Sequence, residues 1–211
     1  MESKEVPSLS IILIAYKAKG FLPQCLRSIK KTVDAPHEVI VVDNNKINRG
    51  FAKAANIGAK KAKGKHLLFL NPDTLIKSGD FKKLLSYLNK NPQTGVVGLK
   101  LILENGSPQP HSFGKKQTII NSLKFWPLAV SCKPEAIEWV SGGALIIRKD
   151  LFEKLGGFDE QFFMYFEDQD LCLRAKKLGY SIKIWPKIEV VHFGGQPAQG
   201  GSTNNKRLQL S

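Results

Sequence analysis

Three aspartates and one histidine, each beside an apolar segment, are the groups of this chain best placed to do chemistry. Asp43 follows one apolar run, Asp73 follows another through Asn-Pro-Asp, and Asp168 opens a stretch with helical spacing. His192 ends a further apolar segment and precedes Phe-Gly-Gly. Carboxylates at strand ends can bind a divalent cation or a ribose hydroxyl, and imidazole is also a metal ligand. A nucleotide diphosphate that binds with a metal ion needs this set of groups.

Asp168 is expected at a helix N-terminus, where the helix dipole favours its ionised form. A carboxylate in that position can take a proton from a hydroxyl group. The alternative is that Glu167 and Asp168 only cap the helix. In the same way, Asn-Pro-Asp-Thr at 71–74 is typical of a turn that caps a following helix, and His192 is typical of a hydrogen-bonded, half-buried residue. The single segments leave these alternatives open.

The segments before the first two aspartates predict a βαβ arrangement. Two apolar, β-branched runs, 8–15 and 38–42, have the composition of buried parallel strands, and 21–33 between them has helical spacing. The carboxyl ends of parallel strands meet at one edge of the sheet, and ligands bind at that edge in open α/β sheets. We therefore expect Asp43 and Asp73 to lie at the same edge.

The rest of the chain alternates between further expected helices and strands. Helices are expected at 50–62, 81–88, 150–155 and 167–178, and strands at 66–70, 96–101, 139–148, 182–185 and 189–192. The region 104–134 is rich in Gly, Pro, Ser and Lys and predicts a long loop, and the polar residues after 195 predict a disordered tail. This order of elements predicts an α/β fold.

The composition is that of an ordinary globular protein. Hydrophobic residues make up 42% and charged residues 24% of the 211 residues. No apolar run has the length of a membrane span, and the first residues lack the pattern of a secretory signal, so we expect a cytoplasmic chain. Cys25, Cys132 and Cys172 are too far apart to predict a disulfide framework or a zinc site.

A formal net charge of +14 calls for an anionic partner or a lysine-rich solvated surface. The lysines are scattered along the expected helices, and no nucleic-acid recognition motif accompanies them, so nucleic acid is a poor candidate. Nucleotide phosphates and the anionic inner face of the cell membrane, with peripheral contact, remain as partners.

Seven short motifs occur in a fixed order over nearly the whole chain. They are SIILIAY (10–16), VVDNN (41–45), NRGF (48–51) with AANIG (54–58), LNPDT (70–74), SGG (141–143), GGFD (156–159) and FEDQDLCLR (166–174). Each motif alone is weak, but the ordered set is specific. Together they resemble the inverting glycosyltransferases of family 2, and the rhamnosyltransferase-like branch in particular.

The resemblance implies a GT-A type fold, which is a single Rossmann-like α/β domain with a mixed, mainly parallel sheet flanked by helices. Within the domain, 1–211, it implies a nucleotide-sugar-binding half at about 8–103, a loop region at 104–135 and an acceptor and catalytic half at 136–195. The polar tail is then 196–211. The implied donor-binding residues are Ala15, Tyr16, Asp43, Asn45, Arg49, Asn56, Asn71 and Asp73. The implied residues of the acceptor and sugar pocket are Trp139, Ser141, Gly142, Gly143 and Glu167.

The resemblance also implies individual roles. Asp43 would contact the nucleobase, and Asp73 would be the surviving carboxylate of a metal-binding Asp-x-Asp, with Asn71 in the first place. Asp168 would be the catalytic base, and His192 would approach the metal or the diphosphate. The implied reaction needs Mg²⁺ or Mn²⁺ and moves a sugar with inversion from a donor such as dTDP-rhamnose or a UDP-sugar. The acceptor is a cell-envelope or polysaccharide hydroxyl, on a free or lipid-linked carbohydrate.

The sequence departs from the family pattern in two places. Only Lys46 and Ile47 separate Asp43-Asn-Asn from Asn-Arg-Gly, where such proteins usually carry a further helix and strand. One βα step of the nucleotide-binding half is therefore expected to be missing. Lys17 stands where the family commonly has Asn. The alternative function is a degenerate glycosyltransferase-like module that binds a nucleotide or a partner without transferring sugar.

Overall fold

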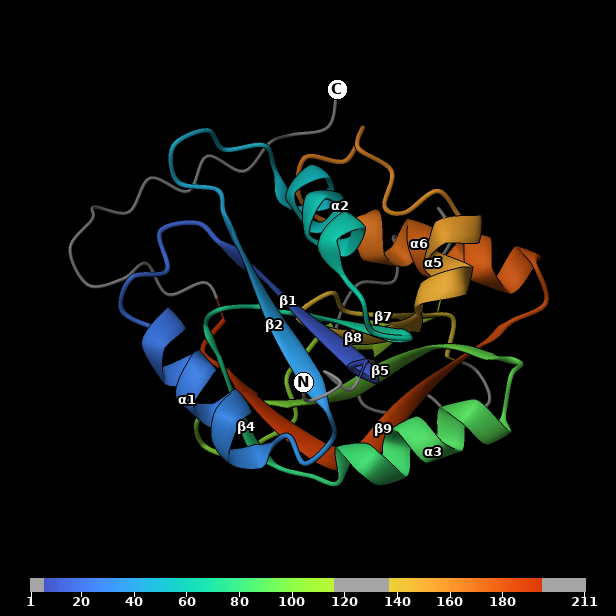
Figure 1. Cartoon of the computed structure of the whole chain (residues 1–211), viewed down its shortest axis with the longest axis horizontal. Helices are drawn as coiled ribbons and strands as arrows, with labels where there is room; N and C mark the ends of the chain where they lie inside the picture. The colour runs from blue at the N-terminus through green and yellow to red at the C-terminus, as the bar shows by residue number, and fades with distance from the viewer. Residues whose placement is uncertain (1–5, 116–136, 195–211) are drawn as a thin grey trace, which may run out of the picture.

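The computed structural model describes residues 6–115 and 137–194 (Figure 1). A seven-stranded sheet has the order β2-β1-β3-β8-β5-β9-β4. Its strands are β1 (Leu9–Ala15), β2 (His37–Asp43), β3 (His66–Leu70), β4 (Thr74–Ser78), β5 (Thr94–Ile102), β8 (Ala144–Arg148) and β9 (Ser181–His192). A small second sheet pairs β6 (Phe113–Gly114) with β7 (Trp139–Val140). The helices are α1 (Leu22–Thr32), α2 (Phe51–Lys61), α3 (Phe81–Lys90), α5 (Lys149–Lys154) and α6 (Glu167–Lys177).

The sheet is mixed and mainly parallel, which confirms the predicted fold class. β1 is parallel to both β2 and β3, with Ala15 opposite Asp43 and Leu13 opposite Leu70. β8 runs antiparallel to β3 and β5, and β4 runs antiparallel to β9, which is itself parallel to β5. The strands β1, β2 and β3 therefore end at one edge, so Asp43 and the residues after Leu70 lie at that edge as expected.

Helices cover both faces of the sheet. Figure 1 shows α2, α5 and α6 above the sheet and α1 and α3 below it. Alternate strand residues face the two layers: Ile12 and Leu67 pack with the upper helices, whereas Ile11 and Leu68 pack with the lower ones. This alternation follows from the pleat of the strands, and it leaves two apolar layers that fix the sheet between the helices.

The chain departs from the sequence prediction after Asn-Pro-Asp. The alternative that this segment caps a helix is wrong, because a strand, β4, begins directly at Thr74 and pairs with β9. The Thr74 hydroxyl donates to the Asn71 carbonyl at 2.6 Å and closes the turn between β3 and β4. The two strands expected near the C-terminus form one strand, β9, whose register with β5 shifts between Leu99 and Lys100.

Two expected regions lie wholly or partly outside the described residues. Of the expected loop region, the structure describes 104–115, which includes β6, and the second part of that region lies outside. The polar tail and Cys132 also lie outside. Cys25 and Cys172 are buried in the two apolar layers.

The missing βα step leaves β2 at the edge of the sheet with exposed side chains. Residues 44–50 are all described, and they run from β2 to α2 without forming a helix or a strand. β2 is the terminal strand of the sheet, and Val39 and Val41 on it are 37% and 41% exposed. A further strand and helix would cover this edge in a fold that had the extra step.

None of the helices in the described residues combines the length and the apolar character that crossing a membrane requires.

Candidate functional site

Asp43 is held at the end of β2 by the side chain and backbone of Asn45. Its Oδ1 accepts hydrogen bonds from the Asn45 amide nitrogen at 2.9 Å and from Asn45 Nδ2 at 2.8 Å. Asn45 also donates to the Ala15 carbonyl at 3.1 Å, and its Oδ1 accepts from the Lys17 amide at 2.8 Å. The bonds from Asn45, its backbone bond first, lower the pKa of Asp43. The carboxylate is therefore ionised and exposed at the edge of the sheet where β1 and β2 end.

Asn44 was missed by the sequence analysis and builds the short connection to α2. Its side chain is buried, with Nδ2 donating to Asn48 Oδ1 at 3.2 Å and to the Gly50 carbonyl at 3.3 Å. Its Oδ1 accepts from the Arg49 backbone amide at 3.0 Å. The Asn pair after a strand was a turn signal that could have indicated this role. The bonds keep Arg49 on the same side as Asp43, whose charge it stabilises.

Tyr16 follows Ala15 at the same edge and is 40% exposed. The Lys17 ammonium lies 5.3 Å from the centre of its ring, within the range of a cation–π contact. Lys17 has a φ of 52°, a left-handed conformation that turns the chain out of β1. The two side chains therefore lie at the same sheet edge as Asp43.

Asn71, Asp73 and His192 meet where β3 ends and β9 ends. His192 Nε2 lies 3.3 Å from Asp73 Oδ1 and 3.2 Å from Asn71 Nδ2. Thr74 stands opposite His192 in the β4–β9 ladder, and the Phe193 amide donates to the Asp73 carbonyl at 3.0 Å. The antiparallel pairing of β4 with β9 thus brings together residues that are more than a hundred positions apart in the sequence.

Gln109 completes this cluster, and no motif in the sequence pointed to it. Its Oε1 lies 2.9 Å from His192 Nδ1. Because an amide oxygen can only accept, Nδ1 carries a proton and donates it to Gln109, and Nε2 on the other side of the ring faces Asp73 and Asn71. A second partner that fixes the tautomer in this way is typical of metal-binding histidines.

The donor set of the cluster fits a divalent cation that is shared with a substrate. Within 6–115 and 137–194, no group of three His, Cys, Asp or Glu side chains could hold a metal ion alone. Asp73 and His192 supply one carboxylate oxygen and one imidazole nitrogen. Mg²⁺ is usually bound in proteins through one or two carboxylates together with substrate phosphates and waters, and imidazole suits other divalent metals. The residues present therefore fit a cation that also binds a diphosphate.

The glycine loop Ser141–Gly143 connects the Asn71 region with α6. The Gly142 amide donates to Asp168 Oδ2 at 2.8 Å, and the Asn71 amide donates to the Gly143 carbonyl at 3.0 Å. A Cβ on Gly143 would lie 3.4 Å from His192 Cε1, which is tighter than most Cβ contacts. The small residues let the loop lie between the cluster around His192 and the first turn of α6. The expected residues Ser141, Gly142 and Gly143 are thus brought together with Asp168.

Asp168 lies in the first turn of α6 with both carboxylate oxygens bonded. Besides the bond from Gly142, its Oδ1 accepts from the Gln169 amide at 2.8 Å. Burial raises the pKa of Asp168, and the backbone hydrogen bonds from Gly142 and Gln169 oppose the shift. The result is a fixed, partly desolvated carboxylate, which is a stronger base than a solvated aspartate.

Glu167, the neighbour of Asp168, is 5% exposed, and its Oε2 has no hydrogen-bond partner among the described residues. Burial, and next the charge of Asp168, raise the pKa of Glu167 to about 7. Two adjacent carboxyl groups thus lie in a desolvated position, and Glu167 holds a proton at a pH where ordinary glutamate does not.

The polar groups of Asn56 and Trp139, which were expected at the donor and acceptor sites, are bonded within the protein. The Asn56 amide is fully used in α2: Nδ2 donates to the Phe158 carbonyl at 2.9 Å and to Glu160 at 3.1 Å, while Oδ1 accepts from the Phe158 amide at 2.9 Å. The Trp139 ring is buried in the core, and its Nε1 donates to the Lys115 carbonyl at 3.1 Å. Both side chains stabilise the fold.

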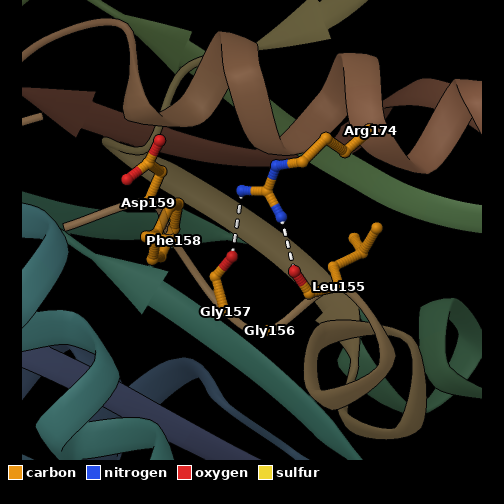
Figure 2. A pocket seen from close by; sticks show the side chains of 6 residues that line it. All are labelled: Leu155, Gly156, Gly157, Phe158, Asp159 and Arg174. Carbon is orange, nitrogen blue, oxygen red and sulfur yellow. Dashed lines mark hydrogen bonds between the residues drawn. The ribbon is translucent and has the colours of Figure 1, made fainter. Parts of the chain in front are cut away.

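Figure 2 shows a pocket of about 280 Å³ at the Gly156–Gly157 turn. Arg174 from α6 donates to the Leu155 carbonyl at 2.7 Å and to the Gly157 carbonyl at 2.9 Å, and its Nε donates to Asp170 at 2.7 Å. The guanidinium is therefore used to hold the turn. Arg174 lies six residues after Asp168, about 9 Å along the helix axis, so the pocket is separate from the site.

Solved structures share this fold. The mannosyltransferase PcManGT from Pyrobaculum calidifontis, in complex with GDP-Man and Mn²⁺, superposes with a TM-score of 0.63 at 19% identity, over 93% of this chain and 59% of its own. TarS 1-349 of S. aureus, in complex with UDP-GlcNAc, superposes with a TM-score of 0.60 at 20% identity, over 93% of this chain and 62% of its own. The chain thus spans about 60% of these two chains, and the likeness confirms a GT-A type fold.

Two rhamnosyltransferases resemble the chain over most of its length. The N-acetylglucosaminyl-diphospho-decaprenol L-rhamnosyltransferase of Mycobacterium tuberculosis is 25% identical, over 96% of this chain and 83% of its own. That alignment spans 254 residues, more than this chain has, so the relative carries segments that are missing here. Rhamnosyltransferase WbbL of Escherichia coli K12 is 22% identical, over 87% of this chain and 82% of its own.

The sequence model described as glycosyltransferase like family 2 matches residues 8–190. This match includes Asp43, Asp73, the glycine loop and Asp168, and it confirms the resemblance drawn from the motifs. The chain belongs to glycosyltransferase like family 2 and is a glycosyltransferase with similarity to the rhamnosyltransferases.

Proposed function

We propose that this protein is a metal-dependent, inverting glycosyltransferase that moves a sugar from a nucleotide diphosphate sugar to a hydroxyl of a cell-envelope or polysaccharide acceptor. The observation that carries the proposal is the position of Asp168. Its carboxylate is bonded through both oxygens, is half-buried, and is joined by the glycine loop to the cluster of Asp73 and His192. The proposed base and the proposed diphosphate site are therefore connected through one loop.

Asp168 acts as the base in this proposal. It takes the proton of the acceptor hydroxyl while that oxygen attacks the anomeric carbon from the face opposite the diphosphate. The glycosidic bond forms as the bond to the diphosphate breaks, so the anomeric configuration inverts. Burial strengthens the base, and the bond from the Gly142 amide fixes its orientation.

The donor nucleotide lies across the edge formed by β1 and β2. Asp43 accepts from the nucleobase, Tyr16 borders the base, and Arg49 stabilises the charge of Asp43. Asn45 positions Asp43 rather than the ligand, through the bonds already described. An aspartate reads an edge that thymine and uracil share, and similarity to rhamnosyltransferases favours dTDP-rhamnose, with a UDP-sugar as the second donor.

Asp73 and His192 hold the divalent cation, Mg²⁺ or Mn²⁺, together with the diphosphate. Bound there, the cation supplies charge that stabilises the leaving diphosphate. Asn71 lies beside His192 and keeps the turn after β3 in place through its bonds to Gly143 and Thr74. Two solved neighbours contain Mn²⁺ together with GDP-Man or UDP, which supports a cation in this position.

The acceptor lies against the glycine loop and the start of α6, so residues 136–195 form the acceptor half and 8–103 the donor half. Ser141, Gly142, Gly143 and Glu167 border its hydroxyl beside Asp168. The mycobacterial relative is named for a sugar linked through a diphosphate to decaprenol. That name supports a lipid-linked carbohydrate as the acceptor class.

Transfer itself tests the proposal. The purified protein is incubated with dTDP-rhamnose or a UDP-sugar, Mn²⁺ and a prenyl-diphosphate-linked N-acetylglucosamine, and the product is examined by mass spectrometry and NMR. We expect one added sugar with the anomeric configuration opposite to that of the donor, and no product when EDTA replaces the metal. Nucleotide binding without transfer would contradict the proposal and favour the degenerate binding module.

A further inference from the structure

Four consecutive large apolar residues stand exposed directly before α6. Phe163, Met164, Tyr165 and Phe166, here called the aromatic segment, are 55%, 54%, 69% and 50% exposed. Scattered exposed apolar side chains are normal on a protein surface, but a contiguous run marks an interaction site. Neither the fold nor the proposed roles of Glu167 and Asp168 account for this run.

The backbone of the aromatic segment is held with its side chains turned outward. Tyr165 and Phe166 both have a φ of 71°, which bulky residues rarely adopt. The Phe51 amide donates to the Phe163 carbonyl at 2.8 Å, and Gly50 packs so closely on that carbonyl that a Cβ there would clash. The segment is therefore fastened to the N-terminus of α2 in this conformation.

The aromatic segment borders the reaction centre of the proposed function, on which this inference rests. Asp168 follows Phe166 by two residues, and the Phe51 ring lies near both Asp168 and the glycine loop at Gly142. An acceptor whose hydroxyl reaches Asp168 must extend over the surface beside it. The aromatic segment is part of that surface.

The residues at the start of α2, which contact Phe163, are rich in positive charge. The segment 46–53 carries Lys46, Arg49 and Lys53 and contains no acidic residue. Lys53 lies 3.8 Å from Glu160, so Arg49, the residue directly before Gly50, provides the positive charge next to this contact. An apolar surface beside a basic one complements a molecule that joins an apolar chain to an anionic linker.

We propose that the aromatic segment binds the apolar chain of a lipid-linked acceptor, with the anionic linker of that acceptor toward Arg49. The sugar at the end of the linker then reaches Asp168. This assignment gives the exposed side chains a ligand of matching chemistry. It also makes the aromatic segment a determinant of acceptor specificity.

The test compares two soluble probes that share the anionic group and differ in the chain: farnesyl diphosphate and inorganic pyrophosphate. Binding is measured by calorimetry for the full chain, the double variant Phe163→Ser, Tyr165→Asn, and the control Leu178→Ser. Asn suits the left-handed backbone at 165. Leu178 is 46% exposed at the opposite end of α6, so its loss matches the apolar change without touching the aromatic segment.

We expect the full chain and the Leu178→Ser control to bind farnesyl diphosphate at least about tenfold more tightly than pyrophosphate. The double variant should bind both probes alike. The inference would be overturned if the double variant still bound farnesyl diphosphate more tightly than pyrophosphate, or if the full chain bound the two probes alike. If the double variant does not fold, Met164→Ser serves in its place, with a smaller loss of the same preference expected.

Two further measurements distinguish this inference from binding to a bilayer and from the proposed function. Binding of the full chain to phosphatidylcholine vesicles without acceptor, lost in the double variant, would assign the aromatic segment to a bilayer and overturn the acceptor proposal. Thermal shifts with nucleoside diphosphates should be the same in the full chain and the double variant. If nucleoside diphosphates gave no thermal shift in the full chain, the proposed function would be contradicted. If the full chain did not bind farnesyl diphosphate more tightly than pyrophosphate, only this inference would be contradicted.

Discussion

The Asp168 carboxylate accepts a hydrogen bond from the Gly142 amide at 2.8 Å, across 26 positions of sequence. This bond joins the first turn of α6 to the glycine loop, and the next residue of the loop, Gly143, accepts from the Asn71 amide. The helix that carries the proposed base and the turn that carries the proposed metal ligand therefore share one loop. A shift of either element would move the other.

Glu167 should make the stability of the protein depend on pH. Its pKa is about 7 in the folded chain against an ordinary value of 4.5, so the folded state holds this proton more tightly than the unfolded chain does. The stabilisation is complete below pH 4.5 and is lost as the pH rises through about 7. Its full size is about 3 kcal/mol.

Urea unfolding at pH 5 and pH 8 checks this prediction. The fall in the free energy of unfolding between the two should be smaller in Glu167→Gln than in the wild type. Glu153→Gln, at a mostly exposed side chain on α5, should leave the fall unchanged. An equal fall in wild type and Glu167→Gln would show that Glu167 is not the group responsible.

Transfer should decline at acid pH because Asp168 must be ionised to act as a base. Burial raises the pKa of Asp168, so the acid limb of kcat/KM should lie above the range of a solvated aspartate, about 3.9. A pH–rate profile with the donor at saturation measures the limb. An acid limb at or below that range would argue against a buried carboxylate as the base.

The metal site can be tested through nucleotide binding. A nucleoside diphosphate should raise the melting temperature of the wild type more with Mn²⁺ than without it if, as proposed, Asp73 and His192 bind the cation together with the diphosphate. Saturation at 100 times the dissociation constant corresponds to about 2.7 kcal/mol. The Mn²⁺-dependent part should vanish in Asp73→Asn and His192→Ala.

His111→Asn is the matched control for that experiment. His111 is exposed and has a φ of 56°, which Asn tolerates, so this variant should keep the Mn²⁺-dependent shift. A shift that survives in both Asp73→Asn and His192→Ala would place the cation elsewhere.

The Gly156–Gly157 turn offers a matched pair for stability. Both glycines have positive φ, but a Cβ on Gly157 would lie 2.6 Å from Asn56 Oδ1, whereas one on Gly156 would meet nothing within 4 Å. Gly156→Ala should cost about 1 to 2 kcal/mol through backbone strain. Gly157→Ala should cost about 2 kcal/mol more, because it also disrupts the bonds between Asn56 and Phe158. Equal losses in denaturant unfolding would contradict this account.

The sequence predicted the part of the site that lies at strand ends. Hydrophobic runs that stop at Asp43 and near Asp73 are local signals, and parallel pairing then places both residues at one edge without knowledge of distant contacts. The same local pattern identified the helix that Asp168 opens. These predictions are confirmed by the ladder of β1 with β2 and β3 and by α6.

The features that the sequence did not predict depend on contacts between distant residues. β4 begins at Thr74, two residues after Pro72, because β9 supplies its pairing partner, and a five-residue strand gives little periodicity of its own. Gln109 meets His192 from a region without regular spacing. Asn56 was expected at the donor because it belongs to a motif, yet its amide is satisfied by Phe158, about a hundred residues away.

Sugar transfer by Asp168→Asn is the most direct test of the central claim. Asn keeps the shape and can still accept from the Gly142 amide, but its nitrogen cannot accept from the Gln169 amide and it cannot take a proton. We predict that transfer falls by about a hundredfold or more and stability by about 1 kcal/mol, while nucleoside diphosphate binding stays near that of the wild type and of Glu153→Gln. Transfer by Asp168→Asn within a few fold of the wild type would contradict the assignment of Asp168 as the base.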